Sequence, residues 1–237
     1  MTVPAAPRQA ALIFVFVTVV LDILAIGLII PVLPPLIAGF FPNAAEGATV
    51  YGWFVTIFAL MQFLASPLLG ALSDRFGRRP VILLSNLGLG LDYIFMALAQ
   101  TLPLLFLGRI IGGITSASIA TANAYIADVT PPEKRAASFG MLGAAFGLGF
   151  VIGPAVGGLL GSVDPRLPFW VAAGLSLTNF LYGWFVLPES LPIERRHRFE
   201  WKRANPIGAL LWLKNFPQVF GLASASFLSV LAHAVFP

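Results

Sequence analysis

Six apolar blocks, each long enough to cross a lipid bilayer as a helix, constrain the fold of this chain more than any other feature. The blocks cover residues 10–34, 51–72, 80–99, 104–127, 137–161 and 169–187, and a seventh begins near Val219 and runs to the last residue. A hydrocarbon core about 30 Å thick needs about 20 apolar residues per helix. Because the apolar residues are continuous rather than alternating, a membrane β-barrel does not fit. The sequence therefore predicts an all-α membrane protein.

The charge content argues against a soluble protein. Only 10% of the 237 residues are charged and 58% are hydrophobic, whereas soluble domains carry about 25% charged residues. The net charge of +4 does not indicate nucleic-acid binding, because the basic residues lie in short loops between apolar blocks. The absence of cysteine excludes disulfides and thiolate metal sites. The long first block, with Asp22 in its middle, is not a cleavable signal peptide.

The basic residues indicate which helix ends face the cytoplasm. Twelve of the 14 Lys and Arg residues lie before block one, between blocks two and three, between blocks four and five, or after block six. Arg166 lies on the opposite side, and Arg109 lies within a block. This excess of positive charge predicts a cytoplasmic N-terminus and a cytoplasmic segment after block six.

Three regions follow from this pattern. Residues 1–187 are expected to form a six-helix transmembrane bundle, residues 188–217 a basic cytoplasmic linker, and residues 218–237 the start of a truncated seventh transmembrane helix. Within the linker, Asn205 and Pro206 are typical of a helix start. Residues 207–213 then either lie along the membrane surface or form an apolar patch in a solvated linker. Because the last block has no polar tail, we expect the N-terminal part of a longer protein.

Three ionisable side chains lie inside predicted membrane helices: Asp22, Asp92 and Arg109. Such groups are costly in a bilayer, so each is a candidate for function, with an ion pair that fixes helix packing as the alternative. Burial disfavours a charged carboxylate and a nearby cation favours it. A carboxylate that moves between these environments takes up and releases a proton, which is the minimum equipment for proton-coupled transport.

Neutral polar side chains also lie within the predicted helices, namely Gln62, Asn86 and Asn123. They either line the same cavity and bind substrate or form hydrogen bonds between helices. Neither interpretation is excluded by the sequence.

The short loop between blocks two and three has a distinctive composition. Residues 70–80 read Gly-Ala-Leu-Ser-Asp-Arg-Phe-Gly-Arg-Arg-Pro. Gly77 allows a tight turn, and Pro80 can start the next helix. Asp74 is an acid among three arginines and can pair with them or reach a helix N-terminus. A role limited to topology and lipid headgroups is the alternative.

Block five carries a stripe of glycines at positions 149, 153, 157 and 161, with Pro154 inside it. Small residues four apart let helix backbones approach closely, and a proline can bend the helix. The stripe predicts either tight packing alone or a slightly bent helix at a moving interface.

These segments resemble the major facilitator superfamily. Residues 70–80 look like its signature loop between helices 2 and 3, and residues 149–158 look like the helix 5 motif of its proton antiporters. Residues 22–34, 108–113 and 188–190 also match family patterns in helices 1, 4 and 6. The similarity is greatest to bacterial tetracycline/proton antiporters, through Asp22, Gln62, residues 73–80, Asp92, Arg109 and residues 125–128. The resemblance implies the six-helix N-terminal half of a major facilitator fold plus part of a seventh helix.

The resemblance also implies roles for the candidate residues. Asp22 and Arg109 would couple transport to protons, and Gln62, Asp92 and Asn123 would contact substrate. Asp74, Arg78 and Asp128 would form a cytoplasmic charge network that stabilises the outward-facing state. Gly149, Gly153, Pro154, Gly157 and Gly158 would form the antiporter motif.

The function implied is proton-coupled efflux in a bacterial inner membrane, with tetracycline exported as a magnesium complex in exchange for H+. No cofactor is expected, since H+ is the coupling ion and Mg²⁺ would belong to the substrate. The expected partners are a small-molecule drug, membrane lipids and a C-terminal half of the same transporter, and nucleic acid is not expected. The alternatives are an exporter of another drug or metabolite, or a non-transporting half. An enzyme is not expected, because the two histidines, His197 and His233, lie in no catalytic or ligand-spaced cluster.

Overall fold

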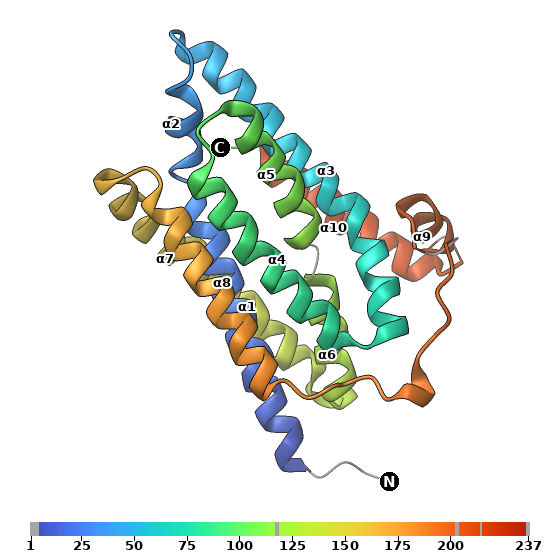
Figure 1. Cartoon of the computed structure of the whole chain (residues 1–237). Coiled ribbons are helices and arrows are strands. Elements are labelled where there is room, and N and C mark those ends of the chain that lie inside the picture. Colours follow the sequence, from blue (N-terminus) through green and yellow to red (C-terminus); the bar gives the residue numbers. More distant parts are fainter. Residues whose placement is uncertain (1–4, 117–118, 202–203, 214, 236–237) are drawn as a thin grey trace.

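The computed structural model describes residues 5–116, 119–201, 204–213 and 215–235 of the chain, and these residues form helices and connecting turns without a strand. The elements are α1 (Ala5–Ile29), α2 (Leu33–Ala38), α3 (Ala44–Phe76), α4 (Arg78–Leu98), α5 (Leu102–Thr115), α6 (Ile119–Val129), η2 (Pro132–Lys134), α7 (Arg135–Val163), α8 (Leu167–Val186), η3 (Ile193–Arg195), α9 (Pro206–Leu213) and α10 (Pro217–Val235). Figure 1 shows the long helices running side by side in one bundle.

Six segments of the described chain are long and apolar enough to cross a membrane, as the sequence predicts. They cover Val15–Ala38, Ala44–Phe76, Arg78–Leu98, Leu102–Val129, Pro132–Val163 and Leu167–Val186. The all-α membrane fold is therefore confirmed. The helices extend beyond the predicted blocks where their ends are polar, because apolar composition marks only the part that crosses the hydrocarbon. For example, α3 begins at Ala44 rather than near residue 51, where the Asn43 side chain accepts a hydrogen bond from the Ala45 N–H at 3.0 Å.

The fourth predicted span corresponds to the segment Leu102–Val129, which contains α5 and α6. Residues 117 and 118, between these two helices, lie outside the described part of the chain. At the end of α5 the Ser116 hydroxyl donates a hydrogen bond to the Gly113 carbonyl at 3.3 Å.

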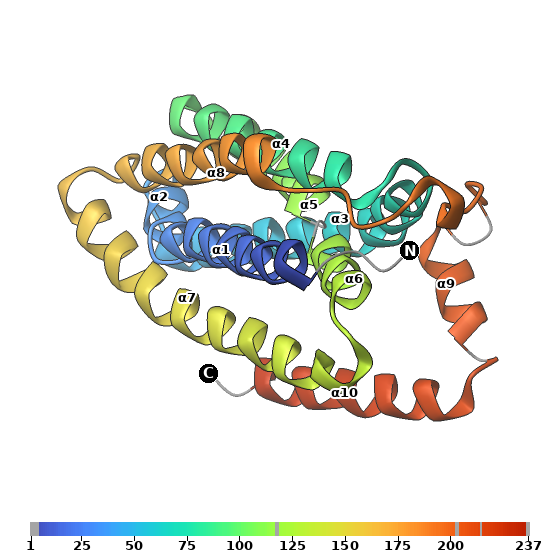
Figure 2. The ribbon, with the colours of Figure 1, turned by 90° about the horizontal axis from the view of Figure 1, so that it is seen from below.

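The bundle is organised around α1 and α4. Helix α1 packs against α7, α8 and α6, whereas α4 packs against α8 and α5, and α3 packs against α5. In Figure 2, α1 lies between α7 on one side and α8 with α4 on the other. Apolar side chains from α1 to α5 and from α8 form the larger core cluster, in which Phe169 is fully buried.

The predicted glycine stripe is the surface on which α7 meets α1. A Cβ added at Gly153 would lie 2.7 Å from the Cα of Gly27, and one added at Gly157 would collide with the backbone of Leu28. A Cβ at Gly149 would collide with Ile23. By contrast, a Cβ at Gly158 would meet no atom within 4 Å. Tight packing therefore explains Gly149, Gly153 and Gly157, whereas Gly158 lies off this interface.

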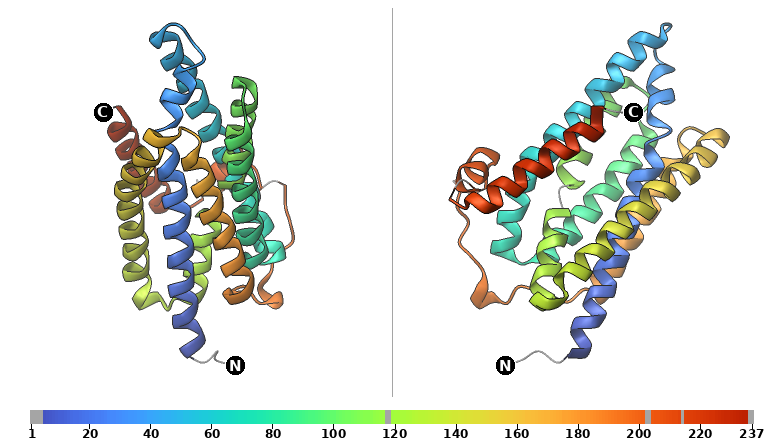
Figure 3. Two further views of the ribbon diagram at one scale, coloured as in Figure 1. Left: turned by 60° about the vertical axis from the view of Figure 1, so that its left-hand side comes forward. Right: turned by 180° about the vertical axis from the view of Figure 1, so that it is seen from behind.

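After α8 the chain runs along one end of the bundle to α9 and α10. The predicted helix start is confirmed, because the Asn205 side-chain oxygen accepts a hydrogen bond from the Gly208 N–H at 2.7 Å. Helix α9 packs beside α3 and leaves Ile207, Leu210 and Leu211 exposed. Figure 3 shows α10 crossing the outside of the bundle. The division of the chain at residues 187 and 217 remains a prediction, as does a membrane crossing by α10.

Candidate functional site

A small cavity lies among the membrane helices and contains two of the three ionisable residues predicted there. Its volume is about 60 Å³, and its polar lining comes from Tyr51, Asp92, Tyr93 and Arg109. These residues belong to α3, α4 and α5, while α1 supplies apolar lining such as Ile26 and Ile29. The cavity thus holds an acid and a base in an otherwise apolar part of the bundle.

The Arg109 guanidinium stacks on an aromatic ring. Its central carbon lies 3.8 Å from the centroid of Phe58 on α3, a close cation–π contact. The Arg109 Nε is buried without a hydrogen-bond partner in the described chain, and no ion pair of Arg109 occurs there. An arginine held in this way keeps hydrogen-bonding capacity for a ligand or for a rearranged carboxylate.

The Asp92 carboxylate lies against the backbone of α5 next to Arg109. A Cβ added at Gly112 would lie 2.7 Å from Asp92 Oδ2, and one added at Gly108 would lie 3.4 Å from Oδ1. The two glycines flank Arg109 in the sequence and so leave room for an acid beside a base. Asp92 is 3% exposed, and its Oδ1 has no hydrogen-bond partner in the described residues.

Asp22 lies at a different place, between α1 and α8. Asn179 of α8 donates a hydrogen bond from Nδ2 to Asp22 Oδ1 at 2.9 Å. Asp22 is buried and does not line the cavity. The structure therefore places Arg109 next to Asp92 and gives Asp22 a neutral amide as its partner. Sequence reasoning missed Asn179, although an asparagine inside an apolar block is the same kind of signal that singled out Asn86.

The remaining predicted substrate residues lie outside this cavity. The Gln62 amide Nε2 donates to the Ser116 hydroxyl at 3.3 Å and links α3 to the end of α5. Asn123 is exposed on α6. Of the three residues predicted to contact substrate, the structure therefore brings only Asp92 into the cavity with Arg109.

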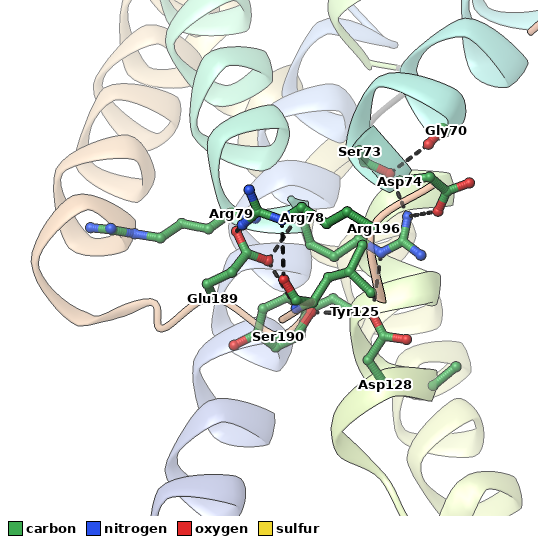
Figure 4. A network of polar contacts seen from close by, with 12 residues as sticks. Gly70, Ser73, Asp74, Arg78, Arg79, Tyr125, Asp128, Glu189, Ser190 and Arg196 are labelled. Carbon is green, nitrogen blue, oxygen red and sulfur yellow. Dashed lines mark hydrogen bonds and ion pairs between the residues drawn. The ribbon is translucent and has the colours of Figure 1, made fainter. Parts of the chain in front are cut away.

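The predicted charge network forms at one end of the bundle and is centred on Arg78 (Figure 4). Arg78 contacts Asp74 of α3 at 2.6 Å through one terminal nitrogen and Asp128 of α6 at 3.2 Å through Nε. The same terminal nitrogen donates to the Ser73 hydroxyl at 2.6 Å. The guanidinium fork thus joins α3, α4 and α6 at their ends, which a single-point cation could not do.

Glu189 is a member of this network that sequence reasoning did not assign. Its carboxylate accepts the backbone N–H of Arg78 at 2.8 Å and that of Arg79 at 3.3 Å, at the first turn of α4 (Figure 4). Gly77 precedes this turn with φ of 105°, and a Cβ there would collide with Glu189. A carboxylate at a helix N-terminus is favourable because it meets unpaired N–H groups and the positive end of the helix dipole. The segment after α8 is thereby fixed to the start of α4.

Further contacts fix the same segment. Ser190 donates to Asp128 at 3.2 Å, and the Tyr125 hydroxyl donates to the Pro188 carbonyl at 2.9 Å. The Arg196 guanidinium lies 3.9 Å from Glu189. The signal for these residues was the sequence Pro188-Glu-Ser190 at the end of block six, which matched a family pattern but gave no partner.

The basic loops lie at the end of the bundle at which α1 begins. The α3–α4 loop, the α6–α7 connection and the segment after α8 all lie at the lower end in Figure 1. Arg166 lies at the opposite end, where it donates to the Ala97 carbonyl at the end of α4 at 2.9 Å. The charge asymmetry in the sequence therefore becomes an asymmetry between the two ends of the molecule.

Sequence and structure comparisons agree on the family. Residues 15–236 match the family model described as Major Facilitator Superfamily. The chain is 45% identical over 95% of its length to the tetracycline resistance protein, class C, of Escherichia coli and 44% identical over 84% to the class D protein of Salmonella ordonez. It covers 56% and 50% of those two proteins, so it spans about half the length of the curated relatives it matches.

Two solved structures share the fold. The human organic anion transporter MFSD10 (TETRAN) aligns with a TM-score of 0.75 and 29% identity, covering 86% of this chain and 55% of that one. A bacterial homologue of the lysosomal transporter Spinster aligns with a TM-score of 0.66 over 79% of this chain and 44% of that one, at 22% identity, and so supports the fold alone. The relatives and the fold are those of transporters rather than enzymes, and the chain belongs to the major facilitator superfamily.

Proposed function

We propose that this chain forms one half of a drug exporter. This half binds the coupled proton and provides part of the substrate site, and tetracycline leaves the cell as a magnesium complex in exchange for protons. The observation that carries the proposal is the separation of two buried carboxylates within one major facilitator bundle. Asp92 lies beside Arg109 in a cavity, and Asp22 lies in a buried interface with a neutral partner. The identity of 45% to a protein named for tetracycline resistance supports the cargo.

The two carboxylates suit different tasks. Asp92 and Arg109 line the cavity and are placed to contact a substrate that enters it. Asp22 is away from the cavity and is placed to hold the coupled proton. If one cationic substrate leaves for each proton that enters, the exchange is electroneutral, and a pH difference of one unit supplies about 1.4 kcal/mol.

The cavity in this chain is too small for the whole cargo. Drug-sized ligands occupy pockets of roughly 300–1,000 Å³, compared with about 60 Å³ here. We propose that a second six-helix half completes the site, as the family resemblance implies. The Asp74–Arg78–Asp128 network would stabilise the outward-facing state by holding the ends of α3, α4 and α6 together. Gln62 and Asn123 would contact substrate only in another arrangement of the helices.

We further propose a bacterial inner membrane with the N-terminus in the cytoplasm. The concentration of basic loops at the end of the bundle where α1 begins supports this orientation.

A proton-release assay tests the proposal. The chain is joined to the C-terminal half of the class C or the class D relative, and everted Escherichia coli vesicles containing each hybrid are given tetracycline with Mg²⁺. We expect proton release that is lost in Asp22→Asn and strongly reduced in Asp92→Asn. If both hybrids are inserted and folded but neither releases protons, the tetracycline assignment is wrong.

One observation favours a second cargo class. Arg109 has no carboxylate ion pair in the described chain, and the human structural relative is named an organic anion transporter. An organic anion could therefore pair with Arg109. Proton-coupled movement of a fluorescent organic anion, without any tetracycline response, would favour this alternative.

A further inference from the structure

The contact between α1 and α8 contains a set of buried polar side chains that is separate from the cavity. Thr18 and Asp22 lie one turn apart on α1, and Ser176 and Asn179 lie one turn apart on α8. Their exposed fractions are 2%, 7%, 0% and 0%, respectively. Side chains spaced in this way share a helix face, so each pair points toward the same interface.

The Asn179 amide is the centre of this interface. Its Nδ2 donates to Asp22 Oδ1 at 2.9 Å and to the Thr18 carbonyl at 3.0 Å, which uses both amide protons. Its Oδ1 is buried without a hydrogen-bond partner in the described chain, and so are Thr18 Oγ1 and Ser176 Oγ. The amide therefore directs its donors toward the carboxylate and leaves its acceptor unused.

This arrangement, with Asn179 donating to Asp22, matches the ionised form of Asp22. An ionised carboxylate only accepts hydrogen bonds, whereas a protonated carboxyl group must also donate one. A side-chain amide carries both a donor group and an acceptor group. Rotation of the Asn179 amide by half a turn would bring its free Oδ1 to the Asp22 hydroxyl, so the same residue can pair with either state.

Few charges reach this pair from the neighbouring helices. From α7, Gly149 lies against Ile23 and Gly153 against Gly27, and the α7 side chains in the same core cluster as Ile23 are apolar. From α8 come Asn179 and the hydroxyl of Ser176, and α4 contributes the buried titratable side chain of Tyr93. Helix α6 contributes Tyr125, whose hydroxyl is bonded to the Pro188 carbonyl. Asp22 makes no ion pair in the described chain.

We propose that Asn179 is a positioning residue that holds Asp22 in both protonation states, and that reorientation of its amide transmits proton uptake from α1 to α8. The proposal rests on the assignment of Asp22 as the proton-binding group in the proposed function. It goes further by giving Asp22 a partner other than Arg109 and by naming the helix that responds to the proton.

Infrared spectroscopy of the full chain in liposomes can test this without any transport. The C=O band of protonated Asp22 is followed against pH and assigned by its loss in Asp22→Asn. Asn179→Leu keeps the branched shape but removes the whole amide. The charged carboxylate loses more than the neutral form, because a hydrogen bond to an ionised acceptor is the stronger one. We expect the band of this variant to persist to a pH about 1 unit higher, about tenfold in proton affinity, and its frequency to shift toward that of an unbonded carboxyl.

Asn86→Leu is the matched control. Asn86 on α4 is also buried, and both of its amide atoms lack hydrogen-bond partners in the described residues. This substitution should leave the Asp22 band unchanged. If Asn179→Leu leaves the Asp22 titration and band frequency as in the unaltered chain, or if Asn86→Leu shifts them as far as Asn179→Leu does, the proposal is wrong.

A pair-exchange variant keeps the test decisive if Asn179→Leu does not fold. Asp22→Asn combined with Asn179→Asp restores one amide and one carboxyl across the same interface. We expect this variant to insert and fold and to show a single titrating carboxyl, whereas Asn179→Asp alone brings two carboxyls together and should titrate in two steps. One-step titration of Asn179→Asp would overturn the proposal. Loss of the tetracycline response with intact Asp22 titration would instead refute only the proposed function.

Discussion

Gly153 of α7 lies backbone to backbone against Gly27 of α1. A Cβ added at Gly153 would lie 2.7 Å from the Cα of Gly27, and one added at Gly27 would lie 2.9 Å from the Cα of Gly153. Neither helix can tolerate a side chain here without moving apart. Because α1 carries Asp22, this contact also fixes the helix that presents the proposed proton-binding group to α8.

Alanine substitutions at Gly153 and Gly158 should differ in their effect on stability, because only Gly153 packs against another helix. Gly153→Ala should lower the free energy of unfolding by about 1–3 kcal/mol, because backbone atoms cannot yield to the added methyl group. Gly158→Ala, in open space, should leave it unchanged or raise it by up to about 1 kcal/mol through helix propensity. Chemical unfolding in detergent micelles, followed by circular dichroism, measures both. Equal effects of the two substitutions would contradict the close contact.

Removal of the Glu189 carboxylate should weaken the start of α4. Glu189→Ala leaves the N–H groups of Arg78 and Arg79 without this acceptor, and the expected loss is about 1–2 kcal/mol in the free energy of unfolding. Glu194→Ala is the control, since Glu194 is an exposed acid in the same segment. Hydrogen exchange at the first turn of α4 should rise in the first variant alone. Unchanged exchange there would show that Glu189 does not cap the helix.

Arg78 should be coupled energetically to Asp128. A lysine at position 78 can pair with one carboxylate but cannot contact Asp74 and Asp128 through two separate nitrogens, as arginine does. A double-mutant cycle of Arg78→Lys with Asp128→Asn, measured on the free energy of unfolding, should give a coupling energy of about 0.5–1 kcal/mol, since the contacts are partly exposed.

Arg135 provides a comparison for this cycle. It donates to the backbone carbonyls of Ala127 and Thr130 rather than to the Asp128 carboxylate. Arg135→Lys with Asp128→Asn should therefore be additive within about 0.5 kcal/mol. Similar coupling in both cycles would mean that the first one reports a general charge effect.

The proposed orientation can be tested by thiol labelling, because the chain has no cysteine of its own. Glu133→Cys lies at the basic end of the bundle, and Pro165→Cys lies in the turn at the opposite end. In intact cells a membrane-impermeant maleimide should label Pro165→Cys and not Glu133→Cys, and everted vesicles should give the reverse. Labelling of Glu133→Cys from outside intact cells would reverse the proposed topology.

The sequence by itself determined the features that depend on local composition and period. Block length and apolar content predicted the six spans because the bilayer sets the length of a helix that crosses it. The charge of the loops, the helix start at Asn205 and the turn at Gly77 also followed from residues adjacent in the chain. The glycine period predicted a close-packed face on α7 that includes Gly153 and leaves out Gly158, but it did not identify α1 as the helix that covers this face.

Only the tertiary structure decided the partners of the polar groups. The family resemblance implied that Asp22 and Arg109 act together in proton coupling, whereas the fold gives Asp22 the amide of Asn179, 157 residues away, and places Asp92 beside the glycines that flank Arg109. Likewise, Glu189 reaches the N-terminus of α4 across 111 residues. Hydrogen bonds and ion pairs act over a few ångströms, so their partners are set by how helices distant in the chain pack and rotate against one another. No local pattern in the sequence contains that information.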